Sequence, residues 1–199
     1  MKVRYAKIEA DDVVNSMTGV NVSLFLQGCD RHCPQCFNPE TWDHNGGTEI
    51  EGDALISEII SLANTNGVER GLSILGGEPL SEQNMYFTVQ LVKKFRETFP
   101  ERKIYLWTGF TIQELSERAQ ADGSKIQQYL LLGIKSKAEN YPYLFFMDIV
   151  TNVDYIIDGP FIQEQKDLSL KLRGSANQHI YSFNKENMTF NILDDEDKQ

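Results

Sequence analysis

Hydrophobic residues along the chain alternate between short strand-like runs and longer segments with helical spacing. Residues 20–26 alternate apolar and polar positions before the run Leu24-Phe25-Leu26, which predicts a strand. Residues 53–64 place their aliphatic side chains three or four positions apart, which predicts an amphipathic helix. The hydrophobic period therefore changes from two residues to about 3.6 residues between these two segments.

The same succession continues through the middle of the chain. Short apolar runs at residues 71–75, 104–108 and 153–157 predict three further strands. Residues 81–99 carry apolar side chains at helical spacing, and Pro100 is expected to end that helix. Each predicted strand is thus followed by a loop and, in most cases, by a helix.

This order of elements defines the expected fold class. Strand, loop and helix recur, so the sequence predicts an α/β fold with a largely parallel sheet and right-handed crossovers. A further helix is expected to begin at the capping box Thr111-Ile112-Gln113-Glu114. The 199 residues are fewer than the about 250 of a complete eight-fold βα barrel. We therefore expect a partial, incomplete βα barrel.

The chain gives no sign of a division into domains. It holds no internal repeat and no linker rich in Pro, Gly or Ser, so we expect a single domain over residues 1–199. Residues 122–143 fit the strand–helix rhythm poorly, and we interpret them as an inserted excursion. The acidic run at residues 194–197 is interpreted as a solvated, frayed C-terminal tail.

Composition and charge exclude several classes of partner. The net charge of −10 argues against nucleic-acid binding, which usually requires a basic face. No apolar run approaches the about 18 residues of a membrane span, and the N-terminus has no apolar signal region. We therefore expect no nucleic-acid partner, no membrane partner and a reducing cytoplasm, where clustered cysteines are typical of metal-binding or catalytic sites.

The most informative chemistry lies in the cysteines. All three cysteines of the chain, Cys29, Cys33 and Cys36, lie within eight residues with the spacing C-x3-C-x2-C. Three thiolates are one too few for a closed four-cysteine cluster or a structural zinc, but on a four-iron cluster they leave one iron open. A zinc site completed by His32 or His179 is the alternative. Because His32 is adjacent to Cys33, its geometry for chelating the same ion is poor.

A glycine turn is expected at the same edge of the sheet. Gly76-Gly77-Glu78-Pro79 directly follows a predicted strand, as do Thr108-Gly109 and Asp158-Gly159. Because ligands of open parallel sheets bind outside the carboxyl ends of the strands, these turns and the cysteine loop should lie together. Gly77 lacks a side chain and can let backbone groups approach a cofactor closely. Glu78 either orients the turn or touches the cofactor.

These residues resemble a known family. The cysteine loop with its aromatic Phe37, and the Gly76-Gly77-Glu78-Pro79 turn, resemble those of radical S-adenosylmethionine enzymes. The resemblance covers residues 13–178, and within that superfamily the chain resembles the activating proteins of anaerobic ribonucleoside-triphosphate reductases. Three further stretches carry it: Trp107-Thr108-Gly109-Phe110, Asp158-Gly159-Pro160-Phe161 and Arg173-Gly174-Ser175-Ala176-Asn177-Gln178.

The resemblance implies two cofactors and a set of residues that hold them. It implies a [4Fe-4S] cluster on the three cysteines, with the open iron chelated by the methionine part of S-adenosylmethionine. Cofactor contacts are implied for Gln35, Cys36, Phe37 and Gly77, with the Phe37 ring near the adenine and the backbone of residues 35–37 hydrogen-bonding the base. Asp158 and Arg173 are further candidates for contacts to the cofactor or the partner chain.

The activity implied by the resemblance is that of a glycyl-radical activase of the radical S-adenosylmethionine type. Iron–sulfur clusters reach the low potentials that cleavage of the sulfonium bond requires. The resulting 5′-deoxyadenosyl radical abstracts a hydrogen from a glycine of the reductase, and water must be excluded during that step. No catalytic residue is implied beyond the cluster and the cofactor.

The implied partners are the reductase itself and a low-potential electron donor such as flavodoxin. Three alternatives stay open at this point. The first is an activase of another glycyl-radical enzyme such as pyruvate formate-lyase, the second is a radical enzyme with a small-molecule substrate, and the third is a non-enzymatic iron–sulfur or zinc module.

Overall fold

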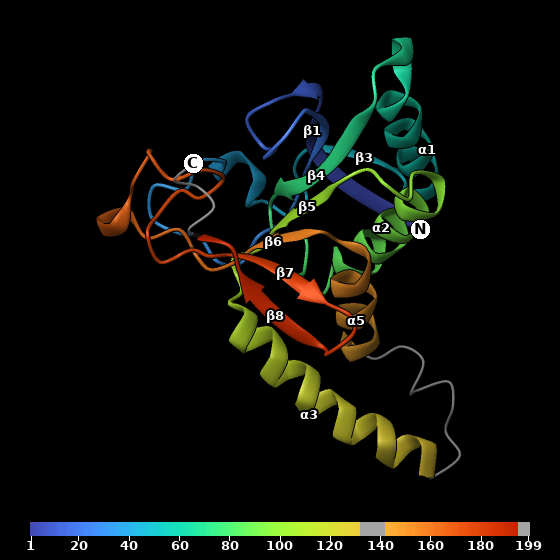
Figure 1. The fold of residues 1–199 in the computed structure, drawn as a ribbon, viewed down its shortest axis with the longest axis vertical. Helices are drawn as coiled ribbons and strands as arrows, with labels where there is room; N and C mark the ends of the chain where they lie inside the picture. Colours follow the sequence, from blue (N-terminus) through green and yellow to red (C-terminus); the bar gives the residue numbers. More distant parts are fainter. Residues whose placement is uncertain (132–141, 195–199) are drawn as a thin grey trace.

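A sheet of eight strands runs through the middle of the protein (Figure 1). The computed structural model describes residues 1–131 and 142–194. The strands are β1 (Lys2–Asp12), β2 (Val20–Leu26), β3 (Thr48–Glu51), β4 (Arg70–Gly76), β5 (Ile104–Trp107), β6 (Tyr155–Ile157), β7 (Ile180–Asn184) and β8 (Thr189–Ile192). The helices are α1 (Gly52–Ala63), α2 (Met85–Thr98), α3 (Ile112–Leu131) and α5 (Pro142–Asn152). Short 3-10 turns lie at Pro39–Thr41, Thr65–Gly67 and Gln163–Gln165.

The strand order is β3-β1-β2-β4-β5-β6-β7-β8. The four central strands, β2, β4, β5 and β6, pair in parallel. The sequence predicted all four of them, and they confirm the α/β fold with a parallel central sheet. The flanking strands pair antiparallel on both sides, and these were not predicted.

The two predicted helices before residue 100 differ in how well their starts were predicted. Helix α1 begins one residue before the expected position. Helix α2 begins at Met85, four residues later than the periodicity suggested. Residues 81–84 instead form a turn in which Asn84 N donates to Ser81 O. The buried Asn84 amide also donates to Gln27 O (3.0 Å) and Glu78 O (3.1 Å), so the turn holds the entry to the cysteine loop.

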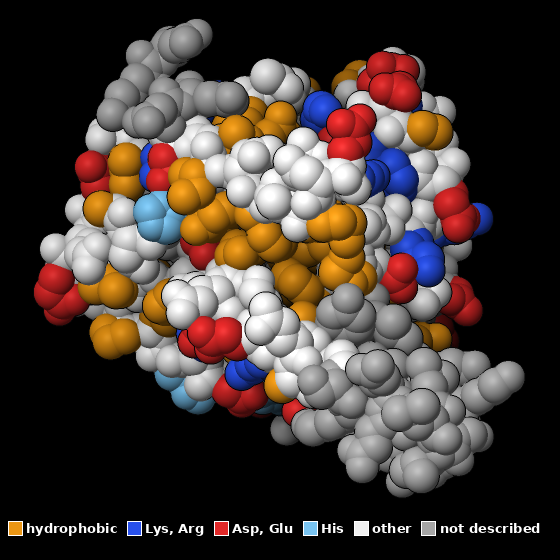
Figure 2. Space-filling view, turned by 60° about the horizontal axis from the view of Figure 1, so that its bottom comes forward, with side chains coloured by type: hydrophobic (Ala, Val, Ile, Leu, Met, Phe, Trp, Pro, Cys, Tyr) orange, Lys and Arg blue, Asp and Glu red, His pale blue; other side chains and the backbone are white. Residues whose placement is uncertain are grey.

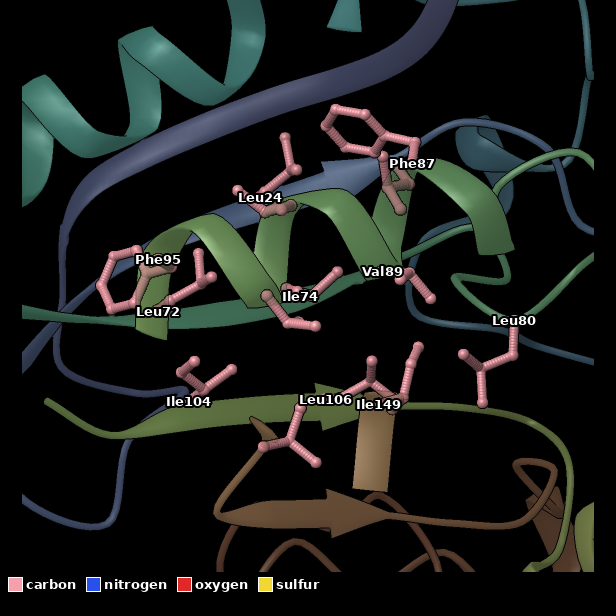
Figure 3. Packing of buried hydrophobic residues seen from close by; sticks show 14 of the residues in the cluster. Leu24, Leu72, Ile74, Leu80, Phe87, Val89, Phe95, Ile104, Leu106 and Ile149 are labelled. Carbon is pink, nitrogen blue, oxygen red and sulfur yellow. The ribbon is translucent and has the colours of Figure 1, made fainter. Parts of the chain in front are cut away.

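Among the described residues, one hydrophobic core joins a single face of the sheet to helices α1, α2, α3 and α5. The cluster includes Leu24, Ile74 and Leu106 of the central strands and Phe87 and Phe95 from the two ends of α2 (Figure 3). Side chains of α1, α3 and α5 belong to the same buried cluster. Because the helices cover this face, the opposite face and the carboxyl ends of the strands are left to the loops, which gather on the left of Figure 1.

Helix α3 includes the first part of the expected excursion at residues 122–143. Helix α3 continues without a break to Leu131, and α5 packs against both α2 and α3. The rest of the expected excursion, residues 132–141, lies outside the described residues. Within residues 1–131 and 142–194, no helix is both long enough and apolar enough to span a membrane.

The expectation of a frayed tail is wrong for its first residue. The Asp194 carboxylate accepts a hydrogen bond from Ile180 N (2.9 Å) and lies 2.5 Å from His179 Nδ1. It also forms an ion pair with Arg173, at 3.3 Å from Nη1. These contacts hold Asp194 against β7, while residues 195–199 lie outside the described residues.

Candidate metal centre

The carboxyl ends of the central strands surround one cavity of about 570 Å³. The three cysteines line it, together with Phe37 and Gly77. Gln35, the remaining predicted cofactor contact, is exposed and lies outside the lining. Five of the six predicted site residues are therefore brought to one place.

The cysteine loop turns sharply just before its second and third cysteines. Cys36 N donates to Cys33 O (3.0 Å), which closes a turn with Pro34 in second and Gln35 in third position. Gln35 has a φ of 56°, the positive value that the third position of a type II turn requires. His32 also has a positive φ, 46°, directly before Cys33. These left-handed residues turn the loop so that its cysteines face one cavity.

The thiols have the chemistry that an iron–sulfur cluster requires. All three are free and partly buried. Burial raises the pKa of the Cys29 thiol above its ordinary value, and the backbone amides of Arg31 and His32 oppose that rise. Asn38 N donates to Cys36 Sγ (3.4 Å), a type of contact that tunes the potential of a bound cluster. The donor set therefore fits a cluster with one open iron.

The zinc alternative requires ligands that converge on a single ion. Among the described residues, no three His, Cys, Asp or Glu side chains are grouped in that way. The His32 ring instead packs edge-on against Trp42, with centroids 4.9 Å apart, and His179 is bonded to Asp194. A four-iron cluster offers each thiolate its own iron, so it does not require the three cysteines to converge on a single ion.

Gly77 lies directly against the cysteine loop. Its amide donates to Leu26 O (2.8 Å), and Glu78 N donates to Gly28 O (2.8 Å). A Cβ at Gly77 would collide with the Gly28 carbonyl oxygen and lie 3.0 Å from Gly28 N. The glycine is therefore required for two backbone segments to meet, and a direct contact with the cofactor stays a prediction.

Glu78 joins two of the turns at this end of the sheet. Its buried carboxylate accepts hydrogen bonds from Leu80 N (2.9 Å), Thr108 Oγ1 (2.7 Å) and Gly109 N (2.8 Å). Burial raises the pKa of this carboxyl, and its hydrogen-bond donors together with the Arg31 guanidinium oppose the rise. Of the two roles considered for Glu78, these contacts support orientation of the turn.

Arg31, inside the cysteine loop, is a site residue that the sequence did not reveal. Its guanidinium lies over the Phe110 ring at 4.2 Å and pairs with Glu114 at 3.3 Å. Its Nε also lies 3.8 Å from the Glu78 carboxylate. Arg31 thus fastens the cysteine loop to the start of α3. No local pattern indicates this role, because Glu114 is 83 positions away.

The two stretches beyond β6 that carried the family resemblance interlock. Gln178 Oε1 accepts from Gly174 N (2.8 Å), while Gln178 Nε2 donates to Gly159 O (2.9 Å). Asn177 Nδ2 donates to Pro160 O (2.8 Å). These side chains replace regular secondary structure in holding the two loops together.

The interlocked loops form a wall beside Phe37. The Phe37 and Phe161 rings lie 4.9 Å apart, and a Cβ at Gly174 would come within 2.7 Å of the Phe37 ring. Phe37 is still 54% exposed. Its ring is therefore positioned by packing and keeps an exposed surface, with Lys166 Nζ over the ring at 5.4 Å from its centroid.

Asp158 and Arg173 have different surroundings. The buried Asp158 carboxylate accepts from Ile112 N (2.8 Å), at the first turn of α3, and from His179 N (3.1 Å). It is not part of the cavity lining, whereas Arg173 is. Asp158 is thus a cap for α3, and Arg173 is the one of the two that can meet a ligand.

We expect Asp158→Ala to lower the free energy of unfolding by about 2–3 kcal/mol, because two N–H groups lose a charged acceptor. Urea denaturation of the purified protein measures this change. Glu97→Ala removes an exposed carboxylate paired with Lys94 and should change stability by less than about 0.5 kcal/mol. Equal stability of the two variants would contradict the capping role.

Comparison with protein families gives the class of this site. Residues 17–181 match a family model described as a 4Fe-4S single cluster domain. The match spans the cysteine loop, the glycine turn and both interlocked loops. It confirms the [4Fe-4S] cluster domain expected from the cysteine spacing.

Curated relatives define the family more narrowly. Three of them are each named anaerobic ribonucleoside-triphosphate reductase-activating protein. The one from Vibrio cholerae serotype O1 is 36% identical over 172 residues, 86% of this chain and 93% of the relative. The relative from Haemophilus influenzae is 32% identical over 91% of this chain and 99% of its own length. The relative from Escherichia coli K12 is 33% identical over 85% of this chain and 92% of its own length. The chain belongs to this family of reductase-activating proteins.

Proposed function

We propose that this protein activates an anaerobic ribonucleoside-triphosphate reductase by generating a glycyl radical on it. The observation that carries the proposal is the gathering of all three cysteines, Phe37 and Gly77 around one cavity. Relatives that cover nearly the same length are named for activation of this reductase. The enzyme is accordingly a radical S-adenosylmethionine oxidoreductase.

The residues around the cavity have separable roles in this proposal. Cys29, Cys33 and Cys36 hold the cluster and leave one iron for the cofactor. When bound, the cluster supplies a low-potential electron and S-adenosylmethionine supplies the hydrogen-abstracting group. Phe37 offers its exposed ring surface to the adenine, and the backbone of residues 35–37 binds the edge of the base.

The architecture supports a polypeptide substrate. Helices cover one face of the sheet and the cavity lies on the other side, and this placement supports our proposal of a partial βα barrel formed by a single domain. Such a barrel is open on one side, so a loop of a partner protein can enter. The proposal includes a low-potential donor such as flavodoxin, and the cytoplasm as the place of action.

Electron paramagnetic resonance of mixed proteins tests the proposal. We expect the reduced, reconstituted protein with S-adenosylmethionine to produce a glycyl signal on the anaerobic reductase, and no signal when the cofactor is omitted. The same mixture with pyruvate formate-lyase is the comparison. A signal on that enzyme alone would assign the activity to the rival class of activase. Cofactor cleavage with no protein radical would indicate a small-molecule substrate.

A further inference from the structure

The three most exposed large hydrophobic side chains among the described residues lie on two loops beside the cavity. Val14 is 77% exposed, Leu168 75% and Val13 64%. Val14 and Leu168 also line the cavity, so they stand at its outer rim. Highly exposed hydrophobic side chains at the mouth of a cavity are candidates for an interaction site.

The backbone of both loops is held in place around these side chains. The Asp12 carboxylate accepts from Val14 N at 2.7 Å. The Asp167 carboxylate accepts from Ser169 N at 2.9 Å and so closes the turn that contains Leu168. Exposed hydrophobic residues on fixed turns lose little conformational freedom when a partner covers them.

The two loops are also fastened to each other and to the sheet. Lys171 Nζ donates to Met17 O (2.9 Å), which joins the loop after β6 to the loop after β1. Met17 N donates to the hydroxyl of Tyr105, a buried residue of β5. The exposed side chains thus belong to one preformed surface.

We propose that Val13, Val14 and Leu168 form an apolar docking rim for the segment of the reductase that carries the radical-bearing glycine. The proposal rests on the proposed function. At about 570 Å³ the cavity has the size of a small-molecule site, so only a short piece of polypeptide enters beside the cofactor. The residues that flank the glycine must then cross the rim, and the rim selects apolar side chains there.

The protein has other exposed hydrophobic residues that serve as controls. Figure 2 shows hydrophobic side chains on the face turned forward from the bottom of Figure 1, where α3 and the β7–β8 hairpin lie. Ile192 of β8 is 60% exposed, and Val68, before the amino end of β4, is 39% exposed. Neither residue lines the cavity.

The experiment compares two matched double variants. One is Val14→Ser with Leu168→Ser at the rim, and the other is Val68→Ser with Ile192→Ser elsewhere. The reconstituted holoproteins are titrated anaerobically with the reductase to obtain the Kd, and cofactor cleavage is measured without the reductase. We expect the rim variant to bind the reductase about tenfold more weakly than wild type, a loss larger than any change in its cofactor cleavage, and the control variant to bind like wild type.

Each outcome decides a separate question. Equal affinity of the rim variant and wild type, or an equal loss in the control variant, would overturn the docking rim while leaving the proposed function intact. A rim variant that changes only the self-association of the activase would assign the surface to a second copy of this chain, and would also overturn it. Failure of the wild-type protein to bind and activate the reductase would instead defeat the proposed function, and the rim with it.

Discussion

Replacing any one of Cys29, Cys33 and Cys36 with alanine will abolish both the four-iron cluster and cofactor cleavage. The chain contains no other cysteine that could take the vacant place on the cluster. Iron and sulfide content after anaerobic reconstitution should fall from about four of each per chain to nearly zero. Cleavage of S-adenosylmethionine should fall to the background of the assay.

His32→Asn is the matched control for the cysteine variants. His32 lies between the first two cysteines and has a positive φ, which asparagine also tolerates. Its ring packs on Trp42, so we expect the variant to keep its iron and its absorption spectrum. Stoichiometric zinc without iron in the wild-type protein, or loss of all metal from His32→Asn, would instead support a zinc site with a histidine ligand.

The central sheet could be predicted because each of its strands is buried and reads as a short apolar run. Strand β1 could not, because irregular register between Tyr5 and Lys7 and between Glu9 and Asp12 breaks its two-residue period. Strand β3 has only four residues and includes the charged Glu49 and Glu51. Strand β3 lies at the edge of the sheet and β1 lies next to it, and strands in such positions are specified by their partners more than by their own hydrophobic pattern.

The site shows the same difference between features that a local sequence motif predicts and features that depend on contacts between distant residues. The cysteines, Phe37 and Gly77 were predicted because each lies in a motif that follows a predicted strand. Contacts of Arg31, Glu78 and Asp158 join residues distant in sequence, through single side-chain atoms, so no local spacing indicates them. The sequence therefore predicts what the site binds, and the structure adds what holds the site together.

Gly77→Ala will cost the protein its cluster as well as its cofactor binding. The added methyl group would collide with the Gly28 carbonyl, one residue before the first cysteine. The Gly28 atoms that the methyl group would meet belong to the backbone and cannot rotate away as a side chain could. The cysteine loop must therefore move. We expect iron content after reconstitution to fall by more than half and the free energy of unfolding by about 1–3 kcal/mol, the usual cost of overpacking.

Gly123→Ala provides the control, because a Cβ at Gly123 in helix α3 meets nothing within 4 Å. This change should leave the cluster intact and raise stability by up to about 1 kcal/mol through helix propensity. The two substitutions add the same methyl group, so the comparison isolates the effect of close approach. If Gly77→Ala kept a full cluster and lost only cofactor binding, the glycine would serve the cofactor directly. Loss of both would show that the contact between the two loops sets the positions of the cysteines.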